Sequence, residues 1–132
     1  MNKDHHNKMF LAKNDPLAQY LGITLVEVGE GYASASMEVK PELLNGHGIT
    51  HGAAIFAMAD VVFGAASNSH GPSALALDAH ISFVKATKLG EILRAEARVE
   101  NLTSKTGLYR MEVVDGDGHM VAVVEGRVIR KA

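Results

Sequence analysis

One carboxylate in this sequence stands where an unpaired charge is costly. Asp60 lies within the most apolar stretch, residues 53–66, and between Leu43 and Val84 the only other acid is Asp78, with no lysine or arginine. An aspartate buried in such surroundings costs several kcal/mol unless it is hydrogen-bonded, paired or protonated. Acids tolerated in this way cluster at functional sites, so Asp60 is the first candidate. A side chain that escapes to solvent, or a polar contact in a subunit interface, is the structural alternative.

A second candidate is the glycine-rich loop of residues 45–53, which precedes the apolar stretch and reads NGHGITHGA. Its glycines free the backbone to expose N–H groups, and the start of a helix adds partial positive charge. Such a loop suits an anion or a developing oxyanion, although an ordinary loop that caps a helix has the same composition. His47 and His51 could also suggest a metal site. Their glycine-broken spacing and the absence of cysteine disfavour it, so no metal is expected.

The spacing of these two features has a consequence for assembly. Gly52 and Asp60 are eight residues apart, which in a helix is about 12 Å along the axis and roughly 80° around it. One carbonyl carbon could not reach both groups within a single chain. If both act on one substrate, the helix start of one subunit must meet Asp60 of another across a two-fold axis. The spacing then predicts a homodimer with two shared sites.

The element that positions both features is a helix predicted over residues 49–67. It is rich in alanine and has apolar residues on every face, which predicts a helix enclosed by the rest of the fold. Thr50 is the expected cap at its start, and Gly71 and Pro72 supply a stop after its last turn.

Alternating apolar and polar residues predict strands around this helix. A short helical segment over residues 8–21, interrupted near Asp15, comes first. The strands are expected at residues 23–28, 32–39, 75–84, 93–100, 108–114 and 119–130. The resulting order, β-β-α-β-β-β-β, predicts an α+β fold with a long, curved antiparallel sheet around one central helix.

Composition narrows the class of protein. The chain has 132 residues, 47% hydrophobic and 21% charged, with a formal net charge of −2 and no cysteine. This length suits one domain over residues 1–132. The charge argues against a nucleic-acid or membrane-surface partner. No stretch has the length of a membrane span, and the absence of cysteine excludes a thiol nucleophile and fits the cytoplasm.

The residues that carry these features resemble a known family. Residues 45–60, NGHGITHGAAIFAMAD, are similar to the signature of hotdog-fold acyl-CoA thioesterases, in particular the phenylacetate-degradation (PaaI-type) branch. The similarity continues at residues 66–69, 83–86 and 89–91 and covers most of the chain from about Leu17 onward. It implies a hotdog fold and hydrolysis of acyl-CoA thioesters without a metal or cofactor.

The resemblance implies a role for each matching residue. Asp60 takes the place of the catalytic carboxylate, as general base on water or as nucleophile, and the Gly52 N–H takes that of the oxyanion donor. Asn45 matches the asparagine that orients water or the thioester, and His51 matches the histidine before the oxyanion glycine. Family members pair the glycine and the acid from opposite subunits and are commonly tetramers of two dimers.

The expected substrate is an acyl-CoA with a phenylacetyl or a related aryl or medium-chain acyl group. The residues expected to bind it are His47, Ala53, Phe63 and Ser67. Phe56 and Met58 are further wall candidates, although the sequence favours a plain core position over a pocket position for both of them and for Phe63. The candidates for contact with the CoA phosphates are Lys85, Lys88 and Lys105, although a lone surface lysine is more often only a solvated charge.

The chain departs from the family pattern at three positions. Ala53 replaces a second glycine, and Gly64 and Ala76 stand where many members have a hydroxyl residue; Ser67 and Ser82 are the substitutes to consider. Asp78 is favoured as a structural acid. One alternative function is a hotdog dehydratase or hydratase that uses His47 with Asp60, although its proline-rich loop is absent. Another is a non-catalytic acyl-CoA-binding module.

Overall fold

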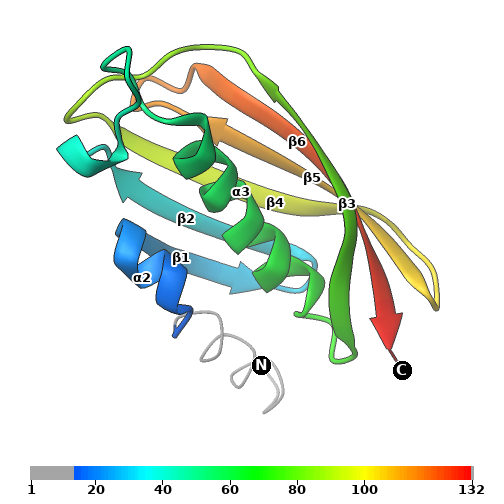
Figure 1. The fold of residues 1–132 in the computed structure, drawn as a ribbon. Helices are drawn as coiled ribbons and strands as arrows, with labels where there is room; N and C mark the ends of the chain where they lie inside the picture. The colour runs from blue at the N-terminus through cyan, green and yellow to red at the C-terminus, as the bar shows by residue number, and fades with distance from the viewer. Residues whose placement is uncertain (1–13, 132) are drawn as a thin grey trace.

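The computed structural model describes residues 14–131, which form one curved sheet with a long helix across it (Figure 1). The expected order of elements and the α+β class are confirmed. The six strands are antiparallel, in the order β1-β2-β4-β5-β6-β3. The elements are α2 (Pro16–Leu21), β1 (Ile23–Gly29), β2 (Tyr32–Glu38), the 3-10 turn η1 (Pro41–Leu43), α3 (Gly52–Ser67), β3 (Ser73–Phe83), β4 (Ile92–Leu102), β5 (Thr106–Val114) and β6 (Met120–Lys131).

Small side chains in the central strands let α3 approach the sheet closely. Ala33 pairs with Ala97 and Ala35 with Ala95 across β2 and β4, and none of these four side chains is accessible. Because alanine keeps the sheet surface low, the larger side chains of α3 fill the space above it. Those that are fully enclosed include Met58 and Val62.

The ends of α3 differ from the sequence-based expectation. The helix begins at Gly52 rather than at residue 49, and its N-cap is His51, not Thr50. It ends at Ser67, before the predicted stop at residues 71–72, because Asn68 serves as the C-cap. The Asn68 side chain also accepts a hydrogen bond from the Ala74 N–H at 2.9 Å, which links the helix end to the start of β3.

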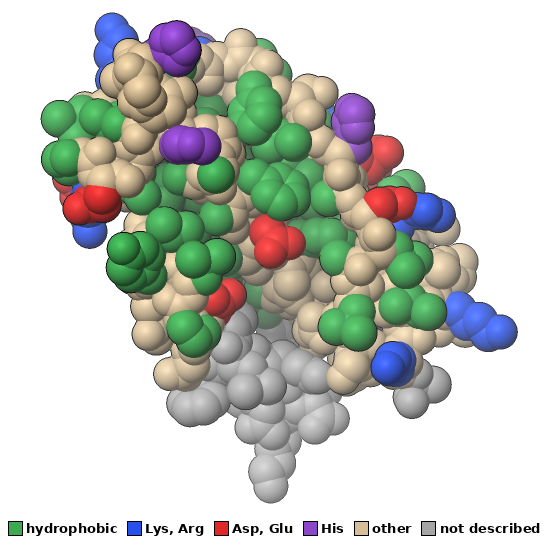
Figure 2. Space-filling model, viewed as in Figure 1, with side chains coloured by type: hydrophobic (Ala, Val, Ile, Leu, Met, Phe, Trp, Pro, Cys, Tyr) green, Lys and Arg blue, Asp and Glu red, His purple; other side chains and the backbone are tan. Residues whose placement is uncertain are grey.

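The helix is buried on one side only. Nine of its sixteen residues are buried, but Ala53, Asp60 and Gly64 are exposed, so the prediction of a helix enclosed all round is wrong for the single chain. Figure 2 shows hydrophobic side chains gathered over the middle of this face, with lysine and arginine mostly towards its edges. The neighbouring edge strand β3 exposes Leu75 by 59% and Phe83 by 56%. Large apolar side chains exposed together in this way are typical of an interaction face.

The helix α2 accounts for the second half of the predicted segment 8–21; residues 8–13 of that prediction lie outside the described residues. Asp15 caps its start and Gly22, with φ of 78°, ends it in the left-handed conformation that glycine favours. The helix packs against β1 and α3. No helix in residues 14–131 is long and apolar enough to cross a membrane.

Candidate active site

The loop before α3 is shaped by the side chain of Asn45. Its Oδ1 accepts hydrogen bonds from the backbone N–H groups of His47 at 2.9 Å and Ile49 at 3.4 Å. These two bonds fix the orientation of the amide, since only the oxygen can accept them. Its Nδ2 donates no hydrogen bond within residues 14–131, so the amide retains donors for a bound molecule.

The first turn of α3 leaves one N–H group unpaired. The His51 Nδ1 accepts the Ala53 N–H at 3.0 Å, and the His51 carbonyl accepts those of Ala54 and Ile55. The Gly52 N–H has no such partner among the described residues. A helix N-terminus with one free donor is suited to stabilise negative charge on an oxygen. His51 thus occupies the other donors of the turn and leaves that of Gly52 available.

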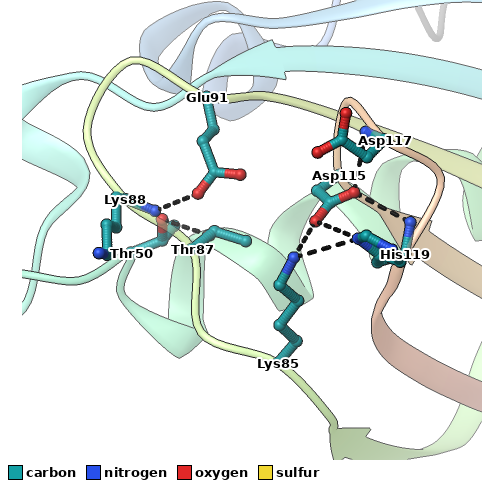
Figure 3. Close-up of polar contacts among 8 residues, drawn as sticks. All are labelled: Thr50, Lys85, Thr87, Lys88, Glu91, Asp115, Asp117 and His119. Atoms are coloured by element: carbon teal, nitrogen blue, oxygen red, sulfur yellow. Dashed lines mark hydrogen bonds and ion pairs between the residues drawn. The ribbon is translucent and has the colours of Figure 1, made fainter.

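A buried pair of threonines holds this loop in place. Thr50 and Thr87 are 4% and 1% exposed, and their hydroxyls are 2.6 Å apart (Figure 3). The Thr50 N–H also donates to the Thr87 carbonyl at 3.0 Å. Thr50, predicted as a helix cap, therefore ties the loop before Gly52 to the connection between β3 and β4.

We expect Thr50→Val to lower the free energy of unfolding by about 1–2 kcal/mol, because the Thr87 hydroxyl would remain buried without its partner. Urea unfolding monitored by circular dichroism measures this difference. Thr24, exposed on β1, provides the matched control, and Thr24→Val should change stability by less than about 0.5 kcal/mol. Equal stability of the Thr50 variant and the wild type would contradict the structural role of the pair.

A second interaction, an ion pair, also holds the connection between β3 and β4 in place. The Lys85 ammonium forms a short ion pair with Asp115, whose side chain is 2% exposed, and Asp115 also accepts the N–H groups of Asp117 and His119 (Figure 3). The hydrogen bond from Lys85, with those from the backbone, holds the pKa of Asp115 well below its usual range. Ligand atoms of Asp115, Asp117 and His119 lie within 4.8 Å of one another, but the buried member of this group, Asp115, is already paired with Lys85.

Asn45 and Gly52 line one cavity together. It has a volume of about 320 Å³, and its other walls come from the end of β3 and the residues after it, including Phe83 and Lys85. A Cβ atom at position 52 would lie 3.0 Å from Phe83 Cζ, so glycine is what admits the Phe83 ring here. The structure therefore brings these two predicted site residues together, with His51 at the adjoining cap.

Asp60 lines a different cavity, of about 510 Å³, between α3, α2 and the start of β3. Its carboxylate has no hydrogen bond or ion pair with any residue in 14–131. Burial by the surrounding atoms raises the pKa of Asp60, and the negative charge of Asp15 raises it further. The two cavities share no lining residue.

The remaining predicted substrate-binding residues are divided between core and surface. Phe63 is 2% exposed and packs against Tyr109, with ring centroids 5.8 Å apart, yet it contributes to the lining of the Asp60 cavity. Ser67 lines the same cavity and donates from its hydroxyl to the Gly64 carbonyl at 3.3 Å. His47 and Ala53 are exposed, in the loop and at the start of α3.

The positions at which the chain differs from the family pattern are also seen in the structure. Gly64 and Ala76 both line the Asp60 cavity, together with Ser67 but not Ser82. Asp78 pairs with Arg127 on the exposed sheet surface, Nε to Oδ2 3.0 Å, as expected of a structural acid.

The remaining candidates are those for the pocket wall and those for contact with the CoA phosphates. Met58 is fully buried in the core and Phe56 half-buried. Lys85 forms an ion pair with Asp115. Lys88 follows in the chain two residues after Ala86, the last residue that lines the Gly52 cavity. Lys105 lies in the turn between β4 and β5.

Sequence reasoning missed two contributions to this region. Asp15 faces the Asp60 cavity, and its only signal in the sequence is a helix cap before a proline. The partnership of Lys85 with Asp115 joins residues 30 positions apart, and no local pattern marks it.

Comparison with known proteins gives a consistent result. Residues 47–122 match the thioesterase superfamily. A relative from Archaeoglobus fulgidus, which carries an esterase name, is 44% identical over 93% of this chain and 80% of its own length. The acyl-coenzyme A thioesterase PaaI of Escherichia coli is 35% identical over 95% of this chain and 89% of its own.

Solved structures agree with these matches. The Escherichia coli PaaI protein, from the phenylacetic acid degradation operon, superposes with a TM-score of 0.92, covering 96% of this chain and 92% of that one. The smu.793 protein of Streptococcus mutans, solved with acetyl CoA bound, is 26% identical with a TM-score of 0.80, covering 83% and 89%. The chain therefore has the hotdog fold and belongs to the thioesterase superfamily, as a homologue of the acyl-coenzyme A thioesterase PaaI.

Proposed function

We propose that this thioesterase hydrolyses acyl-CoA to a free acid and CoA, with Asp60 and the Gly52 N–H acting on the same thioester. The observation that carries the proposal is that the Gly52 N–H at the start of α3 and the partly desolvated Asp60 carboxylate on the same helix both lack a partner within residues 14–131. The name of the Escherichia coli relative and the acetyl CoA bound to the Streptococcus mutans protein support the substrate class.

In the proposed reaction the Gly52 N–H donates to the thioester carbonyl oxygen and stabilises the negative charge that develops there. Asn45 lines the same cavity, and its Nδ2 supplies a second donor to the carbonyl or to water. Asp60 removes a proton from water as the water oxygen attacks the carbonyl carbon. The C–S bond then breaks, and the proton passes to the departing thiolate. Direct attack by the Asp60 carboxylate, followed by hydrolysis of the anhydride, is the nucleophilic variant.

The two groups meet, in this proposal, across a homodimer. Their cavities are separate within one chain, and β3 runs from the Asp60 cavity, at Ser73 to Ala76, to the Gly52 cavity, at Phe83. β3 is also an edge strand. Antiparallel pairing of two β3 strands about their midpoint, Asp78, would set Ser73 of each chain opposite Phe83 of its partner.

The exposed apolar residues support the same assembly. Leu75, Leu77 and Phe83 on β3 and Val84 after it are each more than half exposed in the single chain. Pairing of β3 strands would cover them and satisfy the free edge of the sheet. It would also enclose the exposed face of α3. Pairing of two such dimers into a tetramer in the cytoplasm completes the proposed assembly.

A thiol-release assay on a panel of acyl-CoAs tests the reaction. The panel runs from short aliphatic chains to phenylacetyl and hydroxylated aryl groups, because the Escherichia coli relative comes from the phenylacetic acid degradation operon. Release of free CoA that depends on Asp60 would support the proposal and identify the acyl class. A flat panel, with CoA esters still bound, would instead indicate a carrier or sensor.

Mixed dimers test whether the site is shared. An Asp60→Asn chain and a Gly52→Pro chain, each inactive alone, should regain about half of the wild-type activity per dimer when combined, because one site then has both intact groups. Differently tagged chains, co-expressed and purified through both tags, give assemblies that contain both chains for the thiol-release assay; in a tetramer, pairs of homodimers also carry both tags and lower the regained activity below one half.

The reciprocal mixture provides the control. A chain with both substitutions, paired with a wild-type chain, leaves each shared site with one damaged group and should be inactive. Half activity in this second mixture and none in the first would place both groups within one chain.

A further inference from the structure

The Asp60 cavity contains a second carboxylate that no role yet explains. Among the described residues that line it, Asp60 and Asp15 are the only titratable side chains, contributed by α3 and by the start of α2. The lining residues of β3 and β6 are Ser73, Ala74, Leu75, Ala76 and Val128, none of which carries a charge. Two acids therefore share one cavity without a described lysine, arginine or histidine to balance them.

Asp15 is held firmly in this position. Its Oδ1 accepts the N–H groups of Leu17 at 3.0 Å and Ala18 at 3.1 Å, which caps α2. Pro16 in the first turn fixes the helix start, and α2 packs against α3. The second oxygen, Oδ2, has no hydrogen-bond partner within residues 14–131. The Oδ1 atom of Asp15 thus caps α2, while the Oδ2 atom is available for an electrostatic interaction with groups in the cavity.

We propose that Asp15 is a positioning residue for Asp60: the Asp15 carboxylate, held at the wall of the same cavity, sets the electrostatic environment in which the Asp60 carboxylate acts as base. This inference rests on the proposed function of Asp60 and adds a residue to it. Asp15 does not contact the thioester in this scheme. Its effect on the reaction passes through Asp60 alone.

The electrostatics of the cavity support this role. A like charge nearby disfavours ionisation of a carboxyl group, and partial burial of that group strengthens the interaction relative to a fully solvated pair. Both burial and the charge of Asp15 raise the pKa of Asp60. A more basic carboxylate removes a proton from water more readily, provided that it is still ionised at the working pH.

Two substitutions separate the charge of Asp15 from its capping function. Asp15→Asn removes the charge, and asparagine remains a good N-cap, so α2 should persist. Asp15→Glu keeps the charge but caps less well. The pH dependence of kcat/KM and the titration of the Asp60 carboxyl carbon by NMR are measured for both and for wild type, with Asp60→Asn used to assign the resonance.

In the Asn variant we expect the acid limb of kcat/KM and the Asp60 titration to move to lower pH. Activity on the plateau should fall several-fold, because the base is weaker. The Glu variant should stay near the wild-type profile. An unchanged limb and titration in the Asn variant would overturn the inference, as would equal shifts in both variants, which would indicate a structural effect of the cap.

The two measurements also separate this inference from the proposed function. If the wild type releases no thiol from any acyl-CoA, the proposed function fails, while the NMR titration still decides whether Asp15 acts on Asp60. If the wild type is active and its activity depends on Asp60, but the Asp60 titration is the same with and without the Asp15 charge, only the inference fails.

Discussion

Asp60→Asn should lower kcat for acyl-CoA hydrolysis by about a hundred- to ten-thousandfold, the range that a general base contributes. Asparagine has nearly the same shape but can neither accept the proton from water at neutral pH nor attack the thioester. The carboxylate has no hydrogen-bond or ion-pair partner in residues 14–131, so the substitution breaks no described contact. Thiol release under saturating acyl-CoA measures the loss.

The stability of this variant distinguishes a catalytic role from a structural one. The pKa of Asp60 is raised in the folded protein by burial and by Asp15, so its ionisation opposes folding as the pH rises through that pKa. Above that window Asp60→Asn should be at least as stable as wild type towards urea. A structural acid would give the opposite result, with lower stability.

A matched control uses an acid outside both cavities. Asp117 is exposed in the turn between β5 and β6, and Asp117→Asn keeps a residue that such a turn favours. We expect this variant to hydrolyse acyl-CoA at the wild-type rate. Retention of more than about a tenth of wild-type activity by Asp60→Asn would refute its assignment as base or nucleophile.

The sequence was sufficient to predict the fold and to single out Asp60 as a candidate, because both inferences depend on local patterns. Alternation in the strands follows from one buried face, and an acid among alanines and valines stands out without a structure. The same pattern does not predict which part of the assembly covers α3. Apolar residues on every side predict burial, but they do not distinguish cover by the same chain from cover by a second copy.

The start of α3 is a second feature that local sequence preferences predict incorrectly. Thr50 and His51 are adjacent, and threonine is the commoner N-cap, so sequence favours Thr50. The structure uses His51 because the Thr50 hydroxyl is committed to Thr87, a residue 37 positions later. A long-range contact thus overrides a local preference and moves the start of the helix to Gly52, the predicted oxyanion donor.

That position permits a direct test of the Gly52 N–H as a hydrogen-bond donor. Gly52 is the first residue of α3, where proline is well tolerated, and His51 has φ of −62° and ψ of 133°, an extended conformation that suits a residue before proline. Gly52→Pro therefore removes the N–H while the helix can still form.

Gly52→Ala is the matched variant, because it retains the N–H and adds the same Cβ atom near Phe83, at 3.0 Å from Cζ. The cost of the contact between this Cβ atom and the Phe83 ring is common to both variants. We expect Gly52→Pro to have a kcat about a hundred- to a thousandfold below that of Gly52→Ala, the loss typical of one oxyanion donor.

Binding of a non-hydrolysable CoA thioether separates the donor from the shape of the cavity. A donor that acts mainly in the transition state contributes little to ground-state affinity, so both variants should bind the thioether similarly while their turnover differs. Equal kcat in the two variants would show that the N–H of residue 52 does not stabilise the oxyanion. Because Asn45 lines the same cavity, that result would make the Asn45 amide the next donor to remove.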